Sequence, residues 1–182
     1  MRSSKVDQRR GSAVALGLLM ATLTAPPALP WDAADPGAKQ ARADSLSIGG
    51  AVEHPRSLAL ADLMREPATT ETVLLKTGKG VLKGTYTGVL LWTLLQEAVI
   101  KVSPERRNDV MRHTVIVSSS DGYATVLSAA EIDPEFGGEQ AIIAYAKDGQ
   151  PLADRRGFAR LIFPADKSAG RAVTGVASIT VR

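Results

Sequence analysis

The chain has 182 residues, with 22 Lys and Arg against 19 Asp and Glu, and it contains no cysteine. Hydrophobic residues make up 45% of it, which is typical of a folded domain and not of a disordered chain. The lack of cysteine excludes disulfides and thiolate metal sites. Aromatic residues are scarce, at 4%, which argues against a stacking surface for single-stranded nucleic acid.

The N-terminal segment differs from the rest of the chain. MRSSKVDQRR is polar and basic, and GSAVALGLLMATLTA is apolar and small, which is typical of a secretory signal. The apolar run is about 15 residues, shorter than the roughly 20 of a membrane span, and a short membrane anchor is the alternative. We expect cleavage at Ala41-Arg42-Ala43, or near Ala34.

This segment predicts a signal peptide and linker over residues 1–43 and a domain over residues 44–182. The protein would then be exported, periplasmic or secreted, with no membrane span after cleavage. Six of the basic and three of the acidic residues precede Asp44, which leaves 16 of each in the domain. The domain is therefore close to neutral, and we expect no nucleic-acid partner.

The first half of the domain predicts strands around two short helices. Ser45 to Val52 alternates like a strand that bends at Gly49-Gly50, and residues 58–66 fit a helix that Pro67 ends. Further predicted elements are strands over 70–75 and 81–87 joined by TGKG, a helix over 88–100 capped by Thr87, and a helix start at Ser103-Pro104-Glu105.

The second half predicts strands separated by turns. Apolar and β-branched runs indicate strands over residues 113–118, 123–127, 141–146, 159–163 and 173–181. Many strands with a few interspersed helices predict one mixed α+β domain.

The glycine-rich stretch VLLKTGKGVLKGTYTGV, residues 73–89, is either a phosphate-binding loop or a turn between two strands. A Walker-type loop needs G-x-x-x-x-G-K-[ST] before a helix, whereas Gly80 follows Lys79 here and a strand comes next. A nucleotide-binding loop is therefore excluded. Lys76, Lys79 and Lys83 could still hold an anion with the backbone amides, or could lie on a solvated hairpin tip.

The remaining polar motifs give one candidate site. His54 and His113 are too few for a catalytic zinc site and are expected to be structural, and the acidic EIDPEFGGE segment matches no calcium loop and is expected to be solvated. Tyr123, Arg160 and Arg171 would suit an oxyanion if the fold brings them together. The alternative is a half-buried tyrosine and two surface arginines.

Several fragments in order resemble the molybdopterin-binding domain of sulfite oxidase-type oxidoreductases. They are GGAVEHPRSLALADL, TYTGVLLWTLLQEA, SSDGYATVLSAAEI, AIIAYAKDGQPLADRRGFARLIFP and GRAVTGVASITV. The resemblance implies a strand-rich α+β fold with a groove for a molybdenum cofactor. It places Tyr123 near the tyrosine beside molybdenum in oxidising members, and Arg160 at the arginine of a G-F/Y-P-x-R segment.

The chain departs from this pattern at two places. In catalytic members the strand that matches Thr72 to Leu75 leads to a cysteine whose thiolate binds molybdenum, whereas this chain continues Lys76-Thr77-Gly78. Near the C-terminus the family often has Lys-Trp, and this chain has Thr174-Gly175. No side chain here replaces the soft sulfur ligand.

These departures favour a non-catalytic binding or accessory module with no cofactor and no metal. Its expected partner is a small anionic ligand or a periplasmic protein, and its candidate binding residues are Lys76, Lys79, Tyr123, Arg160 and Arg171. The alternative is a molybdopterin-dependent oxidoreductase acting on a small oxyanion, with Tyr123 as its catalytic candidate. A third hypothesis is a structural or signalling role through an exposed apolar patch around residues 88–100.

Overall fold

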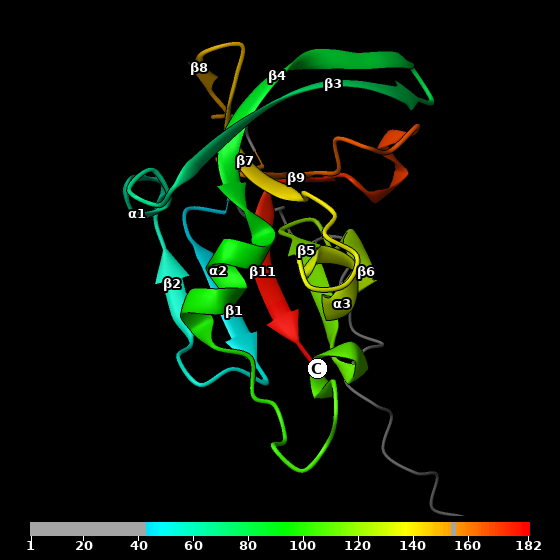
Figure 1. Cartoon of the computed structure of the whole chain (residues 1–182). Helices are drawn as coiled ribbons and strands as arrows, with labels where there is room; N and C mark the ends of the chain where they lie inside the picture. Colours follow the sequence, from blue (N-terminus) through cyan, green and yellow to red (C-terminus); the bar gives the residue numbers. More distant parts are fainter. Residues whose placement is uncertain (1–42, 154–155) are drawn as a thin grey trace, which may run out of the picture. The chain divides into compact units, whose positions relative to one another are not determined.

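The computed structural model describes residues 43–153 and 156–182, and the predicted signal segment 1–42 lies outside them. Within these residues the strands form two sheets (Figure 1). The five-stranded sheet has the order β2 (Arg56–Leu58), β1 (Leu46–Gly50), β11 (Val176–Val181), β5 (Thr114–Ser119) and β6 (Ala124–Ser128). The six-stranded sheet has the order β10 (Val173–Thr174), β9 (Arg160–Ile162), β7 (Ile142–Lys147), β4 (Gly80–Leu90) and β3 (Ala68–Thr77), and β8 (Gln150–Pro151) pairs with β7.

The helices are short, which confirms the predicted strand-rich α+β class. They are α1 (Leu60–Leu63), α2 (Leu91–Ala98) and α3 (Ala129–Ile132), with 3-10 turns η2 (Asp109–Arg112) and η3 (Ala169–Arg171). None of the helices that the structure describes is long and apolar enough to cross a membrane. The leucines of α2 are fully buried in the main core, so they are not available for the exposed patch considered above.

Three local predictions were wrong. Thr87 does not cap α2, because β4 runs on to Leu90 and the amide of Leu91 donates to the carbonyl of Ala141 instead. No helix begins at Ser103, whose amide donates to Asp109 Oδ2 (2.8 Å) in a turn. The predicted strand over residues 173–181 is interrupted at Gly175, whose φ of 72° favours glycine.

Helix α3 was missed, although its sequence carries a start signal. The hydroxyl of Ser128 accepts from the amide of Ala130 (3.3 Å), and Glu131 Oε2 accepts from the amide of Ser128 (2.6 Å). This is a capping box, and S-x-x-E could have been found in the sequence.

The predicted hairpin around TGKG is confirmed and is longer than expected. Strands β3 and β4 pair from Ala68–Val89 to Thr77–Gly80, so the connection is the two-residue turn 78–79. We call the β3–β4 hairpin, residues 68–90, the arm. Strand β7 pairs with β4 only from Tyr86 to Leu90, so the distal half of the arm, residues 72–85, extends past β7 as two strands (Figure 1).

The two faces of this arm differ because side chains alternate along a strand. On the inner face, Val73 and Leu75 are buried with Tyr86 in a second apolar cluster, against which Ala169 and Ala172 pack. The outer face carries Thr70, Thr72, Leu74 and Lys76 on β3, opposite Thr87, Thr85, Lys83 and Val81 on β4. The inner face therefore covers the η3 segment, and the outer face is exposed.

Candidate functional site

A shallow depression of about 280 Å³ lies beside η3. We call it the Tyr123 depression; it is lined by Asp121, Tyr123, Arg156, Ala169, Ala172 and Thr174. Tyr123 donates its hydroxyl hydrogen bond to the carbonyl of Gly170, and the hydroxyl of Thr125 donates to the carbonyl of Arg171 (2.9 Å). These bonds fix the η3 segment to the start of β6.

Asp121 organises the turn that presents Tyr123. Its Oδ1 accepts from the Ser119 hydroxyl and from the amide of Tyr123 (3.1 Å), and its Oδ2 lies 3.9 Å from Arg156 Nη1. The hydrogen bond from Ser119, with those from the backbone and the charge of Arg156, lowers the pKa of Asp121 despite partial burial. The depression therefore holds a carboxylate that is already paired with a guanidinium.

Arg160 lies next to this depression on β9. It pairs directly across the sheet with Thr174, which lines the depression, so the two side chains are on the same face. Its Nη1 donates to the hydroxyl of the fully buried Tyr86 (3.3 Å). Its Nε is buried and has no hydrogen-bond partner among the described residues, which leaves one donor for a ligand or for water.

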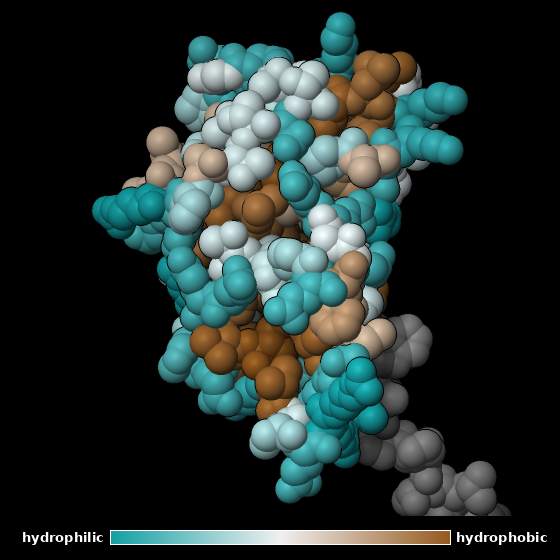
Figure 2. All heavy atoms as spheres, in the orientation of Figure 1, coloured by the Kyte–Doolittle hydropathy of each residue, from teal (hydrophilic) through white to brown (hydrophobic). Residues whose placement is uncertain are grey.

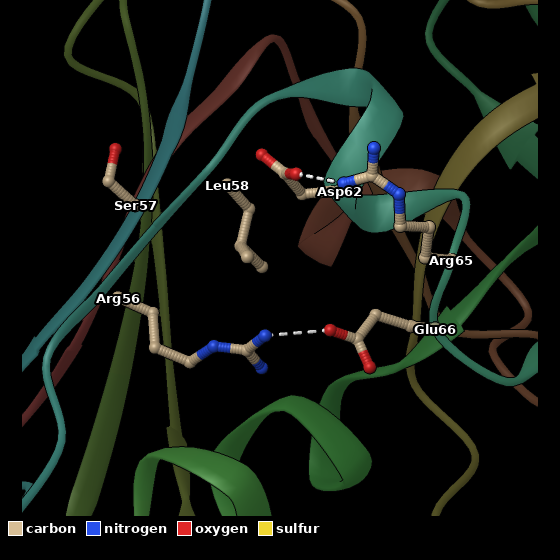
Figure 3. A pocket seen from close by; sticks show the side chains of 6 residues that line it. All are labelled: Arg56, Ser57, Leu58, Asp62, Arg65 and Glu66. Atoms are coloured by element: carbon tan, nitrogen blue, oxygen red, sulfur yellow. Dashed lines mark hydrogen bonds and ion pairs between the residues drawn. The ribbon is translucent and has the colours of Figure 1, made fainter.

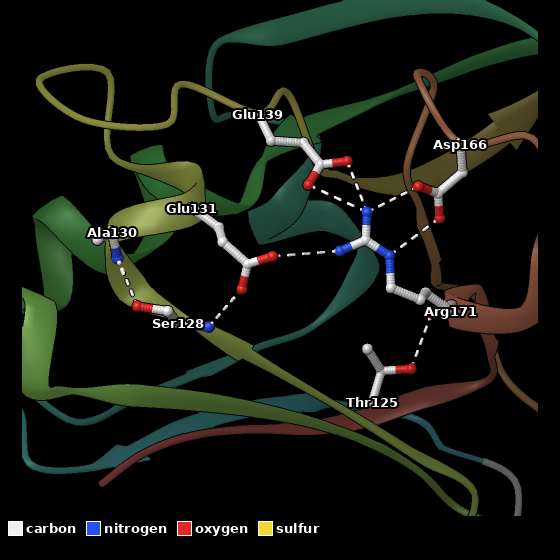
Figure 4. Close-up of polar contacts among 7 residues, drawn as sticks. All are labelled: Thr125, Ser128, Ala130, Glu131, Glu139, Asp166 and Arg171. Carbon is white, nitrogen blue, oxygen red and sulfur yellow. Dashed lines mark hydrogen bonds and ion pairs between the residues drawn. The ribbon is translucent and has the colours of Figure 1, made fainter.

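Arg171, the third predicted anion-binding residue, is surrounded by carboxylates (Figure 4). It contacts Asp166 (2.7 Å), Glu139 (2.8 Å) and Glu131 (3.5 Å), and its guanidinium carbon stacks 4.0 Å from the centroid of the Phe163 ring. Hydrogen bonds to Asp166 and then Glu139 raise its pKa, although burial opposes this. These contacts favour a structural role, holding η3 to the 131–139 loop.

The EIDPEFGGE segment is therefore not simply a solvated loop. Glu131 and Glu139 bind Arg171, and Asp133 is buried with its Oδ1 accepting from the amide of Glu135 (2.9 Å). His113 lies 3.7 Å from Asp109, outside the Tyr123 depression. No group of three or more His, Cys, Asp or Glu within residues 43–153 and 156–182 could hold a metal ion.

The structure does not bring the predicted lysines together with Tyr123 and Arg160. Lys76 is on the outer face of the arm, whereas Ala169 and Ala172 of the depression pack against the inner face. Its backbone alone contacts the site segment, because its amide donates to the carbonyl of Lys167 (3.1 Å). Lys79 is exposed in the turn at the tip.

Another depression, of about 440 Å³, is lined by residues of β2, by Asp62 of α1 and by Arg65 and Glu66, which follow α1 (Figure 3). Its two arginines face carboxylates, Arg56 with Glu66 and Arg65 with Asp62, each at 2.7 Å. Arg56 also contacts Glu97. The charges in this depression are thus paired internally, and it offers less to an anion than the Tyr123 depression does.

Comparison with known proteins identifies the family. The model of the "Oxidoreductase molybdopterin binding domain" matches residues 34–182. The chain belongs to this family. Among solved structures, the fold is similar to that of the sulfane dehydrogenase SoxCD from Paracoccus pantotrophus, with a TM-score of 0.59 and 23% identity. The match covers 75% of this chain and 37% of that one, and a search of curated proteins found no match.

Family membership implies a molybdenum cofactor, and the residues present do not fit its metal. The resemblance places the metal-binding cysteine after Thr72–Leu75, where this chain forms the arm and its two-residue turn. The chain has no cysteine anywhere, and lysine and threonine do not replace a soft thiolate. The positive side chains near Tyr123 could hold only the anionic part of such a group.

Sequence reasoning missed Arg156. It precedes Arg160 in the same RRGFAR segment and reaches the depression, whereas only Arg160 matched the family motif. Two arginines flanking Gly157 are a signal that could have been used, because a glycine there allows the chain to turn closely. The Cβ of any other residue at position 157 would lie 3.0 Å from the carbonyl oxygen of Ala43.

Proposed function

We propose that this chain is a non-catalytic member of its family that binds a small anion in the Tyr123 depression. The observation that carries the proposal is that the chain has no thiolate and forms the two-residue turn 78–79 where the family resemblance places the cysteine. A domain of this kind keeps the scaffold of an oxidoreductase and lacks the side chain that anchors the metal.

The charges around the depression support an oxyanion as ligand. Arg156 lines it, and Arg160 is adjacent with a buried Nε donor that has no partner in the described part of the chain. An oxyanion supplies several acceptors, which suit the guanidinium groups of Arg156 and Arg160. Asp121 offsets part of this positive charge, so a singly or doubly charged anion fits better than a polyphosphate.

Arg160→Gln tests this binding. In titration calorimetry with sulfate and phosphate, we expect the variant to bind at least about tenfold more weakly, because a hydrogen bond to a charged group contributes about 1.5–3 kcal/mol. Arg65→Gln is the matched control, because Arg65 follows α1, lies outside the Tyr123 depression and pairs with Asp62 (Figure 3). Equal affinities in all three proteins would contradict the proposal.

A molybdopterin-dependent oxidoreductase is the second candidate, favoured by the family match over residues 34–182. Metal and pterin analysis of protein made in a host that synthesises molybdopterin separates the two functions. We expect far less than one molybdenum and one pterin per chain. Stoichiometric amounts of both, with a visible absorption band, would establish the oxidoreductase instead.

We further propose that the protein is exported and serves as an accessory module for a periplasmic partner. The basic and apolar start of the sequence supports export. Fractionation of expressing cells tests it directly: the chain should be found in the periplasm or medium, and retention of all of it in the cytoplasm would contradict this part.

A further inference from the structure

The outer face of the β3–β4 arm carries an unusual combination of side chains. Leu74 and Val81 are 67% and 61% exposed, and the register places Leu74 opposite Lys83 and Val81 opposite Lys76. Side chains directly opposite on one face of a sheet are neighbours. The distal arm therefore presents two aliphatic side chains and two lysines in a diagonal arrangement, with Lys79 at the tip.

The distal half of the arm carries lysines and no acidic residue, whereas Glu71 is at its base on the inner face and Asp148 accepts from the amide of Thr85 (2.8 Å). The sequence contains no Asp or Glu from Thr72 through Gln96. Within residues 43–153 and 156–182, the ion pairs found do not include Lys76, Lys79 or Lys83. The predicted domain is close to neutral, so this cluster is a local excess of positive charge.

The distal half of the arm projects from the six-stranded sheet. It lies beyond the end of the β4–β7 pairing, and Figure 2 shows an apolar patch at this upper part of the molecule bordered by hydrophilic side chains. The proximal half of the same face is formed by threonines that bond to each other, Thr70 with Thr87 (3.2 Å) and Thr72 with Thr85 (3.1 Å). The face is therefore polar at its base and apolar and cationic at its end.

We propose that the distal outer face of the arm binds the surface of a membrane that contains anionic lipids. The aliphatic side chains would enter the boundary between headgroups and acyl chains, and the lysines would extend to the lipid phosphates. Charge complementarity decides the occupant: lysines around exposed aliphatic groups match a surface that is anionic outside and apolar beneath. This inference concerns the face opposite the Tyr123 depression and does not depend on anion binding there.

The lack of cysteine makes a site-specific test possible. V81C in the full chain, labelled with an environment-sensitive dye, should shift to shorter emission wavelength with phosphatidylglycerol vesicles and not with phosphatidylcholine vesicles. V126C is the matched control, because Val126 is also 61% exposed but lies on β6 of the other sheet. No shift at position 81, an equal shift at position 126, or an equal shift with both lipids would overturn the proposal.

Charge variants complete the test. Every variant has the same N-terminal segment, so a difference in vesicle binding between them cannot come from that segment. Adding K76Q/K79Q/K83Q to labelled V81C should weaken vesicle binding by about 100-fold, since each lysine contributes roughly a fivefold factor at an anionic surface. K101Q/R106Q/R107Q removes three exposed charges elsewhere and should change binding by less than about threefold. Equal effects of the two triple variants, or binding to poly-glutamate but not to vesicles, would overturn the membrane surface as partner.

Discussion

The hydroxyl of Tyr123 donates a hydrogen bond to the backbone carbonyl of Gly170, so the residue that the family resemblance places beside the metal holds the η3 segment in this chain. Phenylalanine at position 123 would keep the ring and lose this bond. Because the side chain is half exposed, we expect Tyr123→Phe to lower the free energy of unfolding by no more than about 1 kcal/mol. Urea denaturation measures the change.

Thr125→Val is the partner experiment, because Thr125 makes the adjacent bond to the carbonyl of Arg171. The two bonds hold one segment, so we expect their effects to be coupled. The loss of unfolding free energy in the double variant should therefore differ from the sum of the two single losses. Strict additivity would indicate that the bonds act independently, and no loss in either variant would refute the role assigned to them.

Arg171 should be far more important for stability than for binding. Arg171→Gln leaves Asp166, Glu139 and Glu131 close together without a cation, and it removes the stacking on Phe163. We expect a loss of about 2–4 kcal/mol in unfolding free energy at pH 7, with a smaller loss near pH 4, where carboxylates begin to be protonated.

Arg65→Gln is the comparison for this measurement. Its side chain is 75% exposed and pairs with one carboxylate, so the change should stay within about 0.5 kcal/mol. If Arg171→Gln were equally mild, the carboxylates around it would not depend on its charge.

Asp121 should account for part of the loss of stability at acid pH. Its pKa is lowered in the folded protein, first by the hydrogen bond from Ser119. A carboxyl group with a lowered folded pKa stabilises the fold above its unfolded pKa of about 3.9, and this stabilisation is lost as the pH falls through the folded value. Asp121→Asn should therefore reduce the fall in unfolding free energy between pH 5 and 3, with Glu105→Gln as an exposed control. If the fall in unfolding free energy between pH 5 and 3 were the same in Asp121→Asn, the stabilising role given to the Asp121 carboxylate would be wrong.

Gly88 should tolerate no side chain. A Cβ there would lie 2.3 Å from the carbonyl oxygen of Ile143 and 2.4 Å from the Cα of Ala144, both backbone atoms of β7. We expect Gly88→Ala to cost about 1–3 kcal/mol or more and to lower the melting temperature accordingly. Gly49→Ala, where nothing lies within 4 Å, should be close to neutral. A neutral Gly88→Ala would show that β4 and β7 can separate at this point.

The contacts of Ala43 predict where a signal would be cleaved. Ala43 is buried, and its amide donates to the carbonyl of Arg156 (3.1 Å). It also forms an isolated parallel β-bridge with Gly157. Cleavage directly after Ala43 would remove this contact, whereas cleavage near Ala34 would keep it. N-terminal sequencing of exported protein should therefore find a start upstream of Ala43, and a start at Asp44 would contradict this expectation.

The sequence was informative where the signal is local. The TGKG turn with flanking alternation predicted the β3–β4 hairpin, and the leucine spacing predicted α2. The site depends on contacts between distant residues: Arg171 meets Glu139, 32 positions away, and Thr125 meets the carbonyl of Arg171, 46 positions away. No periodicity encodes such contacts, which explains why Arg171 was grouped with anion-binding residues, although its guanidinium is surrounded by the protein's own carboxylates.

Gly175 connects β10 of one sheet directly to β11 of the other, and a Cβ there would lie 2.7 Å from the carbonyl oxygen of Arg156. Because one tightly packed residue joins the two sheets, unfolding of one sheet should disturb the other. The domain should therefore melt cooperatively, with backbone amides of β9 and β11 becoming exposed to hydrogen exchange in a single event.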